Sequence, residues 1–481
     1  MIQLASIEKL ETKDIPKLVE MVNNELKRKK ELYERYRRKT SDVEIISGKD
    51  NINISFEKYI IDNASGYLGG KEPTYEVQIA SDDKKKGLLK KLLNKIIPSE
   101  DYAESMKTII DHIVDYNDDG AENYELVKDL LITGTCYEIL YENEDNEIVY
   151  TRKDPLQTQA IWDYSVPRNL IGIVNTYTEK DINNKETTIV ELTDSTGTRK
   201  FKGSGSNYEE EKIDDKLKNH NWGDVPYDVV EIPDAIGLFE PVLDLITAYE
   251  ELIQNVKNTF KYNDKAKLKV TGYRPSEPLL IKNEQGNLIE NESRKKEDEA
   301  LLKAPVFYTP DDGNIDWIIK NIDDASTQNT LKTYIDLIMM ITGVPQTTDL
   351  GFTKADNASA IDRKFFTLEQ VTTEAMQLLK MAYKRRWELI FNRYNLKGQQ
   401  FDFRDVKITL NKNLPANENE IIDMYLKLRG LVSDETIIER LPLDLDANSE
   451  DEKIKLQEED KLDKKIKEAS AMGGFNNKEN E

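Results

Sequence analysis

Few residues in this chain have the types and spacing that chemistry at a reactive site requires. It has two histidines, His112 and His220, and one cysteine, Cys136. His112 has acidic neighbours in an expected helix, where a surface position is the simpler interpretation than a metal ligand. We expect His220, in a polar stretch, to be exposed. One thiol cannot close an internal disulfide or build a cysteine-rich zinc site, so Cys136 is expected to be a small buried side chain in a reducing compartment.

Patterns for phosphate, calcium or nucleophilic chemistry are incomplete. Gly66–Lys71 has glycines and a lysine, but their spacing is not that of a phosphate loop, and a helix stop is expected instead. Asp444–Asn448 begins like an EF-hand loop, yet Ser449 replaces the required glycine and Lys455 the bidentate glutamate. Gly203–Ser206 lacks the apolar strand that precedes a nucleophile elbow. We therefore expect no catalytic residue, no cofactor, no metal site and no enzyme activity.

The charge distribution is more informative. The chain has 68 basic and 91 acidic residues and a net charge of −23, so it is not expected to grip nucleic acid over its whole surface, although it could surround DNA. Between residues 344 and 400, nine basic residues face six acidic ones. Lys384, Arg385 and Arg386 cluster toward the end of an expected helix, where cations complement the helix dipole. They could also pair with a neighbouring subunit or contact DNA phosphates.

The elements that must position these residues are mostly helices. Apolar residues recur at helical spacing in six segments: Thr12–Tyr36, Ile52–Gly70, Pro98–Tyr116, Ala121–Ile132, Ala325–Thr342 and Ala358–Tyr394. Two hairpins are predicted where apolar runs flank turn residues, Glu138–Tyr141 with Ile148–Tyr150 and Thr187–Leu192 with Arg199–Lys202. Gly203–Ser206 and Glu209–Asn221 indicate an exposed excursion. Residues 1–233 should therefore form a mixed α/β body.

A long helix is expected over residues 234–264, with one narrow apolar seam. Its members are spaced alternately by four and three, which suits packing against neighbouring helices. They are Leu238, Val242, Leu245, Tyr249, Leu252 and Val256. Strands are predicted at Leu268–Gly272, Leu279–Lys282 and Val306–Thr309, with a charged loop at Asn291–Asp298. A seam that one chain cannot cover requires repeated neighbours, as in a ring.

The segment from Gly343 to Tyr394 combines a helix stop, a polar loop and a long helix. Ile335–Ile341 is apolar nearly all round and should be buried between neighbours, and Gly343-Val344-Pro345 ends that helix. Inward candidates on the next long helix are Phe365, Leu368, Ala375, Leu378, Ala382 and Leu389. Beyond it we predict a strand at Asp402–Asn411, a helical pair at Glu418–Gly430 and Ser433–Leu441, and a polar tail. No apolar run reaches about 18 residues, so no membrane span is expected.

Short motifs along most of the chain resemble one family. In order they are Tyr59–Asp62 with Gly66–Gly70, Gly134–Glu138, Trp162-Asp163, Val225–Tyr227, Leu245–Glu250, Gly343–Asp349, Asn357–Ile361, Phe366–Gln370, Val406–Thr409 with Asn413–Pro415, and Gly430–Ser433. This series resembles the portal proteins, or head-to-tail connectors, of tailed bacteriophages of the siphophage type from Gram-positive hosts. Each motif alone is weak, but their order over roughly residues 50–445 is specific.

The resemblance implies a mainly helical α+β fold, repeated as a ring, usually a dodecamer, at one capsid vertex. It implies a wing over residues 1–233, a first stem helix over 234–264, a clip over 265–322 and a second stem helix over 323–343. A tunnel loop over 344–357, a long helix over 358–400 and a crown over 401–460 would follow. Residues 461–481 would be a polar, disordered tail.

The resemblance also implies a role and partners. The ring would pass double-stranded DNA during packaging and ejection without sequence specificity, and it would dock the terminase large subunit and a head–tail adaptor. Major capsid and scaffolding proteins would be further partners, with synthesis in the host cytoplasm and a final place in the virion. The tunnel loop would bring six residues to the DNA channel: Gln346, Thr347, Thr348, Asp349, Lys354 and Asn357.

Because packaged DNA must slide, strong phosphate binding along a tunnel would be counterproductive. A mainly acidic wall repels phosphate, while a narrow ring of Lys354 could touch it transiently. Lys354 could equally pair with Asp349 or Asp356 of a neighbouring subunit. Two other classes stay open at this point: a monomeric or differently assembled scaffold or adaptor protein, and a DNA-packaging enzyme, which should carry a phosphate loop or a carboxylate metal cluster.

Overall fold

The computed structural model describes residues 2–7, 10–37, 54–78, 99–180, 182, 184–213, 219–264, 267–271, 276–303, 312–319, 323–346, 358–413 and 427. The chain divides into two compact units. The first comprises Met1–Tyr33, Tyr59–Leu238 and Thr342–Glu481, and the second comprises Glu34–Lys58 and Phe239–Ile341. Each unit is described by itself.

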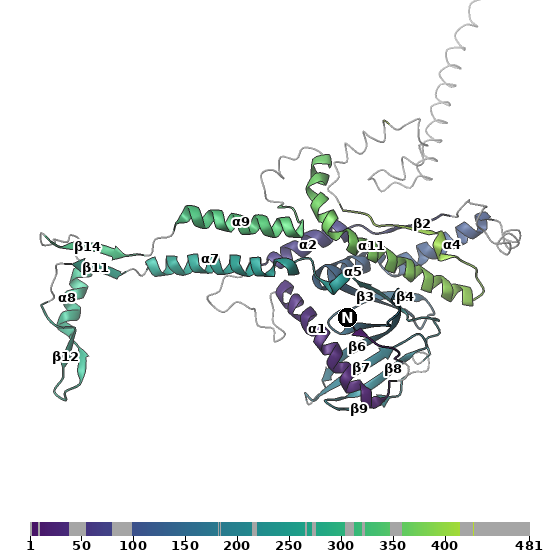
Figure 1. Cartoon of the computed structure of the whole chain (residues 1–481), viewed down its shortest axis with the longest axis horizontal. Helices are drawn as coiled ribbons and strands as arrows, with labels where there is room; N and C mark the ends of the chain where they lie inside the picture. Colours follow the sequence, from purple (N-terminus) through teal and green to yellow (C-terminus); the bar gives the residue numbers. More distant parts are fainter. Residues whose placement is uncertain are drawn as a thin grey trace, which may run out of the picture. The chain divides into compact units, whose positions relative to one another are not determined.

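A six-stranded sheet covered by a helix forms one part of the first unit. Its order is β1-β5-β6-β7-β8-β9, with β1 parallel to β5 and the other pairs antiparallel. The strands are β1 (Ile2–Gln3), β5 (Thr158–Trp162), β6 (Leu170–Lys180), β7 (Glu186–Thr193), β8 (Thr198–Ser204) and β9 (Asn207–Glu211). Helix α1 (Ile15–Arg37) follows a 3-10 turn, η1 (Thr12–Asp14), and buries Leu18, Val22 and Leu26 against this sheet. Figure 1 shows α1 lying along it.

The opposite side of the sheet meets a second, three-stranded sheet. This sheet has the order β10-β3-β4 and is antiparallel throughout, with β3 (Thr135–Glu142), β4 (Ile148–Lys153) and β10 (Tyr227–Glu231). Because side chains alternate along a strand, Ile161 and Val174 face α1, whereas Ala160 and Ile173 pack with Tyr137 and its neighbours on the second sheet. The apolar residues of the central strands are thus buried on both faces.

Three helices pack around the three-stranded sheet: α4 (Ser99–Tyr116), α5 (Asp119–Thr133) and the 39-residue α11 (Ala358–Leu396). Helix α2 (Phe56–Gly69) lies against α5 and α11. After α11 come a 3-10 turn, η4 (Phe403–Asp405), and β15 (Val406–Thr409), which pairs antiparallel with β2 (Thr74–Val77). Gly134 joins α5 to β3 with φ +73°, and a Cβ there would lie 2.2 Å from the backbone of Ala235, so only glycine fits.

The second unit contains two long helices joined through short strands. Helix α7 (Leu243–Asp264) leads into β11 (Lys267–Thr271), and β14 (Asn314–Ile318) precedes α9 (Asp324–Thr342). Strands β11 and β14 pair antiparallel, which brings the end of α7 and the start of α9 to one place (Figure 1). Between them lie a hairpin, β12 (Leu280–Lys282) with β13 (Leu288–Glu290), and helix α8 (Glu292–Lys303).

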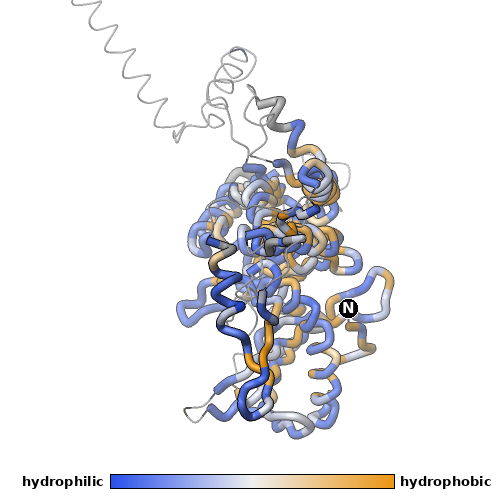
Figure 2. The backbone as a smooth tube through the Cα atoms, turned by 90° about the vertical axis from the view of Figure 1, so that its left-hand side faces the viewer, coloured by the Kyte–Doolittle hydropathy of each residue, from blue (hydrophilic) through white to orange (hydrophobic). Residues whose placement is uncertain are grey.

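The main helices and both predicted hairpins are confirmed, and helices predominate in this α+β fold. None of the helices among the described residues is long and apolar enough to cross a membrane. Figure 2 shows hydrophilic and hydrophobic residues interspersed along the helices. The predicted strand Val306–Thr309 and the helical pair Glu418–Gly430 and Ser433–Leu441 lie outside the described ranges, as does most of the expected crown and all of the polar tail.

Three local predictions are wrong. The long helix begins at Leu243, after two 3-10 turns, η2 (Pro233–Ala235) and η3 (Glu240–Val242), rather than at residue 234. The segment 203–211 is not an excursion, because β8 and β9 pair there and extend the sheet. Residues 292–298 of the charged stretch lie in helix α8: Asn291, just before it, accepts a hydrogen bond from the Ser293 amide (3.1 Å), and Arg294 pairs with Asp298 one turn ahead (2.8 Å).

Candidate functional site

The predicted basic cluster lies on α11, and Arg386 is completely buried inside the first unit. Its Nε and Nη2 atoms donate to the two carboxylate oxygens of Glu138 at 2.7 and 2.8 Å, and Nη1 donates to Asp119 at 2.7 Å. The guanidinium also lies over the rings of Tyr150 and Tyr383, at 4.2 and 4.4 Å. The prediction that it contacts DNA or a neighbouring subunit is wrong for Arg386, because every direction around its guanidinium is occupied within the chain.

Burial and charge act in opposite directions at this residue. Burial by itself lowers the pKa of Arg386, but the nearby Glu138 and Asp119 outweigh it and raise that pKa well above its ordinary value. Burial also raises the pKa of Glu138, an effect that Arg386 partly offsets. Removing one partner of such a buried pair typically costs about 3–5 kcal/mol, since it leaves an uncompensated charge. Arg386 therefore anchors the C-terminal part of α11 to β3 and α5.

Arg385 and Lys384 have different environments. The Nη2 atom of Arg385 pairs with Asp224 at 2.9 Å and also donates to the carbonyl of Val225 at 3.3 Å. Lys384 is exposed. Of the three predicted residues, Lys384 is thus the one whose side chain is directed to solvent in a single chain, and a contact of Lys384 or Arg385 with DNA or another subunit stays a prediction.

The last turns of α11 carry a second set of ion pairs. Arg393 donates to both oxygens of Glu142 at 3.0 and 2.6 Å, and Lys397 lies 2.9 Å from the same carboxylate. Hydrogen bonding from Arg393, with Lys397, lowers the pKa of Glu142 to about 2. Much of the positive charge that distinguishes residues 344–400 is therefore compensated by acids of β3 and of the loop before β10.

The two ends of the predicted tunnel loop are both held by α2. The hydroxyl of Tyr59 donates to the carbonyl of Pro345 at 3.1 Å, and the ring of Tyr67 stacks on Phe365 at 4.4 Å. The Tyr67 hydroxyl also donates to Glu369 at 2.8 Å, and Glu369 forms an ion pair with Lys412. The chain therefore leaves α9 and enters α11 at fixed places on the same helix.

Gly343 makes the exit from α9 possible. Its φ is +72°, and a Cβ would lie 2.8 Å from the backbone of Thr367 and Leu368. Gln346 is half-buried. The other predicted loop residues, Thr347, Thr348, Asp349, Lys354 and Asn357, lie outside the described residues, so their contact with DNA stays a prediction.

The predicted seam is only partly covered within one chain. Val242 and Tyr249 are buried, whereas Leu245, Leu252 and Val256 are half-buried. Tyr249 meets Phe56 edge to face at 5.1 Å in the second unit. Leu238 is half-buried and belongs to the first unit, where its amide donates to the carbonyl of Leu131 at 2.7 Å.

Large apolar side chains on α7 and α9 are exposed. Phe260 of α7 is 61% exposed, and Met340 and Ile341 of α9 are 63% and 39% exposed, whereas Ile338 is buried. The long helix α11 buries Phe365, Leu368, Ala375, Ala382 and Leu389 as predicted, while Leu378 is half-buried. Exposed apolar patches on helices commonly mark sites where another protein packs.

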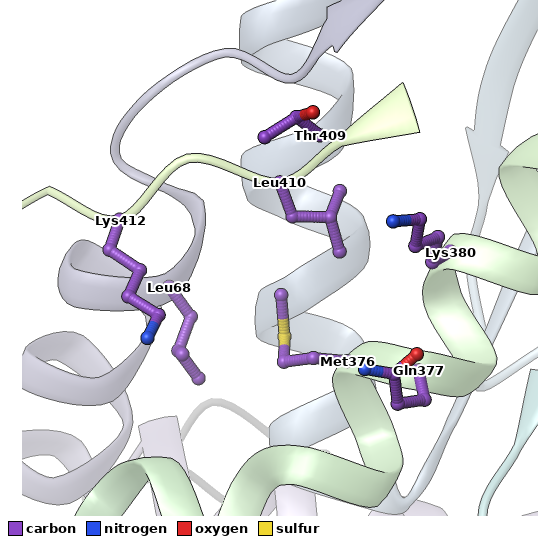
Figure 3. A pocket seen from close by; sticks show the side chains of 7 residues that line it. All are labelled: Leu68, Met376, Gln377, Lys380, Thr409, Leu410 and Lys412. Carbon is purple, nitrogen blue, oxygen red and sulfur yellow. The ribbon is translucent and has the colours of Figure 1, made fainter. Parts of the chain in front are cut away.

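A pocket of about 240 Å³ opens beside α11. Figure 3 shows Met376, Gln377 and Lys380 of α11 facing Leu410 across it, with Leu68 and Lys412 at the other end. Its floor is apolar, and of its two ammonium groups that of Lys412 is paired with Glu369.

The histidines and the cysteine take no part in a reactive cluster. His112 is half exposed and lies 3.1 Å from Glu147, as expected of a surface histidine. His220 is half-buried, so its predicted exposure is wrong: its Nε2 meets the carbonyl of Asp194 at 2.8 Å, and burial lowers its pKa. Cys136 is buried, as predicted. No group of three or more His, Cys, Asp or Glu residues that could hold a metal occurs in the part of the chain that was described.

The sequence did not reveal the partners of Arg386. Glu138 and Asp119 lie 248 and 267 residues before it, and acids are too abundant in this chain for a pair to stand out. One signal was available: Glu138 interrupts the apolar run Cys136–Tyr141, and a charge in a buried strand requires a partner.

The described residues thus combine long helices, buried ion pairs in the first unit and exposed apolar side chains on α7 and α9. The family model for "Phage portal protein, SPP1 Gp6-like" matches residues 17–464. The chain belongs to this family of phage portal proteins, which confirms the resemblance seen in the sequence motifs. Portal proteins are structural components of phage particles rather than enzymes.

The chain was also compared with solved structures and with curated proteins. A solved chain from the neck of an empty GTA particle, computed with C6 symmetry, is similar over 80% of this chain and 90% of that chain. Their sequence identity is 11% and the TM-score is 0.35, which is too low to support any conclusion. No curated protein matches this sequence.

Proposed function

We propose that this chain forms the ring at one capsid vertex through which double-stranded DNA is packaged and ejected. The observation that carries the proposal is the family match over residues 17–464. The ring would be a dodecamer, assembled in the host cytoplasm and incorporated in the virion. It would also dock the terminase large subunit, the head–tail adaptor, and the major capsid and scaffolding proteins.

The parts of the ring would follow the chain. Residues 1–233 would be the wing, 234–264 and 323–343 the stem helices, and 265–322 the clip. The long helix 358–400 would lead to a crown over 401–460. The observed second unit supports the stem and clip because it contains residues 239–341, with a pair of long helices and short strands. It also contains residues 34–58, which this division assigns to the wing.

The exposed apolar residues support repeated neighbours. Phe260, Met340 and Ile341 are large and accessible in one chain. In a closed ring every subunit makes the same contact with the next, so the exposed apolar side chains of each subunit can be covered by its neighbour. This arrangement would bury apolar side chains that are exposed to water in a single chain.

The DNA channel would be lined by the segment between α9 and α11. Gln346, Thr347, Thr348, Asp349, Lys354 and Asn357 would face the DNA there. The anchoring of Pro345 and Phe365 on α2 supports a loop with fixed ends.

Electron microscopy of the purified chain tests the proposal. We expect turbine-shaped rings with a central hole, in the free protein or after co-expression with capsid and scaffolding proteins of the same phage. A chain that stays a compact monomer under both conditions would contradict the ring and favour an adaptor or scaffold. Capsids assembled without this chain should also fail to package DNA.

A further inference from the structure

Two acidic side chains face each other inside the first unit. Asp228 of β10 and Glu138 of β3 are direct partners in the antiparallel register, and they are 4% and 1% exposed. Directly opposed residues on one face have Cβ atoms about 4.5–5.5 Å apart. Two carboxylates this close in a buried place cannot both be ionised unless each has its own cation.

The hydrogen bonds distinguish the two groups. Both oxygens of Glu138 accept from Arg386, at 2.7 and 2.8 Å. By contrast, neither oxygen of Asp228 has a donor within hydrogen-bonding distance among the described residues. The cation paired with it is Arg385, whose Nε lies 3.8 Å away and whose Nη2 is bonded to Asp224 at 2.9 Å. Glu138 is thus built to hold a negative charge, and Asp228 is not.

The other cations around the two carboxyl groups already form ion pairs with other acids or with Glu138. Arg386 divides its donors between Glu138 and Asp119. Arg152 of β4 lies opposite Glu138 in the register but pairs with Asp129. Titratable and charged groups face the pair from every element around it: Arg385, Arg386 and Tyr383 from α11, Asp119 and Glu122 from α5, Cys136 from β3, Arg152 from β4, Tyr75 from β2, and Asp224 from the loop before β10.

We propose that Asp228 keeps a proton at neutral pH and shares it with Glu138, so that a protonated carboxyl pair joins β3 to β10 beneath α11. Loss of the proton would place a second negative charge opposite Glu138 and weaken the joint on which α11 rests. The joint would therefore be sensitive to alkaline pH. The proposal is independent of the proposed function, because it concerns one chain.

The direction of the pH effect follows from the folded-state pKa. Burial, together with the charge of Glu138, raises the pKa of Asp228 well above its ordinary value. The unfolded chain releases this proton near pH 4. The folded state therefore binds more protons, and the stability contributed by Asp228 falls as the pH rises from about 4 through the folded-state pKa.

Infrared spectroscopy of the wild-type chain tests the proton directly. With ¹³C-labelled aspartate at about pH 8, where ordinary carboxyls are ionised, we expect a carboxylic-acid C=O band in the folded protein. The band should vanish on unfolding and in Asp228→Asn. A wild-type spectrum without that band would overturn the proposal, and this measurement needs no variant to fold.

Thermal unfolding over a pH series tests the joint. Asn has the shape of protonated Asp and no charge to lose, so the melting temperature of Asp228→Asn should exceed that of the wild type increasingly as the pH rises. Asp224→Asn is the control, because Asp224 shares Arg385 but is accessible to water. Parallel pH profiles for the wild type and Asp228→Asn would contradict the proposal.

Discussion

At the scale of single residues, α11 shows how an acidic chain uses its cations. Arg386 and Arg393 each hold a carboxylate with two hydrogen bonds, and Arg385 and Lys397 pair with acids nearby. Bidentate arginine pairs fix orientation as well as charge. Arg385, Arg386 and Arg393 therefore attach this helix to β3, to β10 and to the loop before β10.

Glu142 should make this attachment sensitive to acid. Its folded-state pKa is lowered to about 2, chiefly by hydrogen bonding from Arg393, whereas an unfolded glutamate titrates near 4.3. Its contribution to stability is present above the unfolded value and is lost as the pH falls through the folded value. We expect Glu142→Gln to lower the melting temperature at neutral pH, with the difference shrinking toward pH 2.

The matched control for this series is Glu144→Gln, an exposed glutamate in the same hairpin turn. It should change the melting temperature little at any pH. Equal pH profiles for the two variants would show that the Arg393 pair does not stabilise the fold.

Lys354 is the residue whose role depends most on the proposed ring. Replacement by Ala should leave ring assembly intact but alter packaging velocity or retention of DNA, because a ring of lysines would touch phosphate transiently. Packaging rate and the yield of full heads measure the effect. If both are unchanged, Lys354 has no contact with DNA that matters, and a pairing with Asp349 or Asp356 of a neighbour is the better explanation.

At the scale of elements, α2 acts as the support for the junction between α9 and α11. It holds Pro345 through Tyr59 and Phe365 through Tyr67, while Glu369 links Tyr67 to Lys412. These contacts join four segments that are far apart in the sequence. A substitution in this junction should therefore be most destabilising where its backbone lies closest to that of α11.

That point is Gly343, and Gly343→Ala should destabilise the first unit. The substitution forces an L-residue to φ +72° and places a Cβ 2.8 Å from the backbone of Thr367 and Leu368. We expect a loss of about 1–3 kcal/mol in the free energy of unfolding for the overpacking, in addition to the backbone strain. Urea denaturation measures it.

Gly223→Ala separates the two causes. Gly223 has φ +79° in the same unit, but no atom lies within 4 Å of a Cβ placed there. It therefore reports backbone strain alone. If Gly223→Ala is as destabilising as Gly343→Ala, the close approach at Gly343 contributes nothing.

At the scale of the whole molecule, exposed apolar side chains are the feature that a single chain leaves unexplained. Met340 on α9 and Phe260 on α7 are more than half exposed, although each lies on a long, regular helix. Burying such a side chain typically stabilises an interface by about 1.5–3 kcal/mol. Repetition around a ring would multiply that gain by the number of subunits.

Met340→Asp should therefore prevent assembly without unfolding the chain. The circular dichroism spectrum and the melting temperature of the monomer should stay near those of the wild type, whereas sedimentation velocity should show loss of the ring. Thr333→Asp, which adds the same charge at an exposed polar position of α9, should still assemble. Normal rings from Met340→Asp would place the subunit contact elsewhere.

The sequence by itself determined what depends on local periodicity and on motif order. Apolar spacing located α1, α2, α4, α5, α9 and α11 to within a few residues, because a helix or strand buries one face at a fixed interval. The ordered motifs identified the portal family. Local capping and ion pairs were missed at Asn291–Asp298, where charge alone suggested a loop.

Only the tertiary structure decided which charges meet. Arg386 finds Glu138 at a separation of 248 residues, and Asp228 faces Glu138 because two strands share one register. Sequence spacing carries no information on such pairs, and 91 acidic residues offer too many candidates. The fold therefore made one residue of the basic cluster, Arg386, the internal anchor of a helix, because a buried guanidinium must be satisfied by the carboxylates around it.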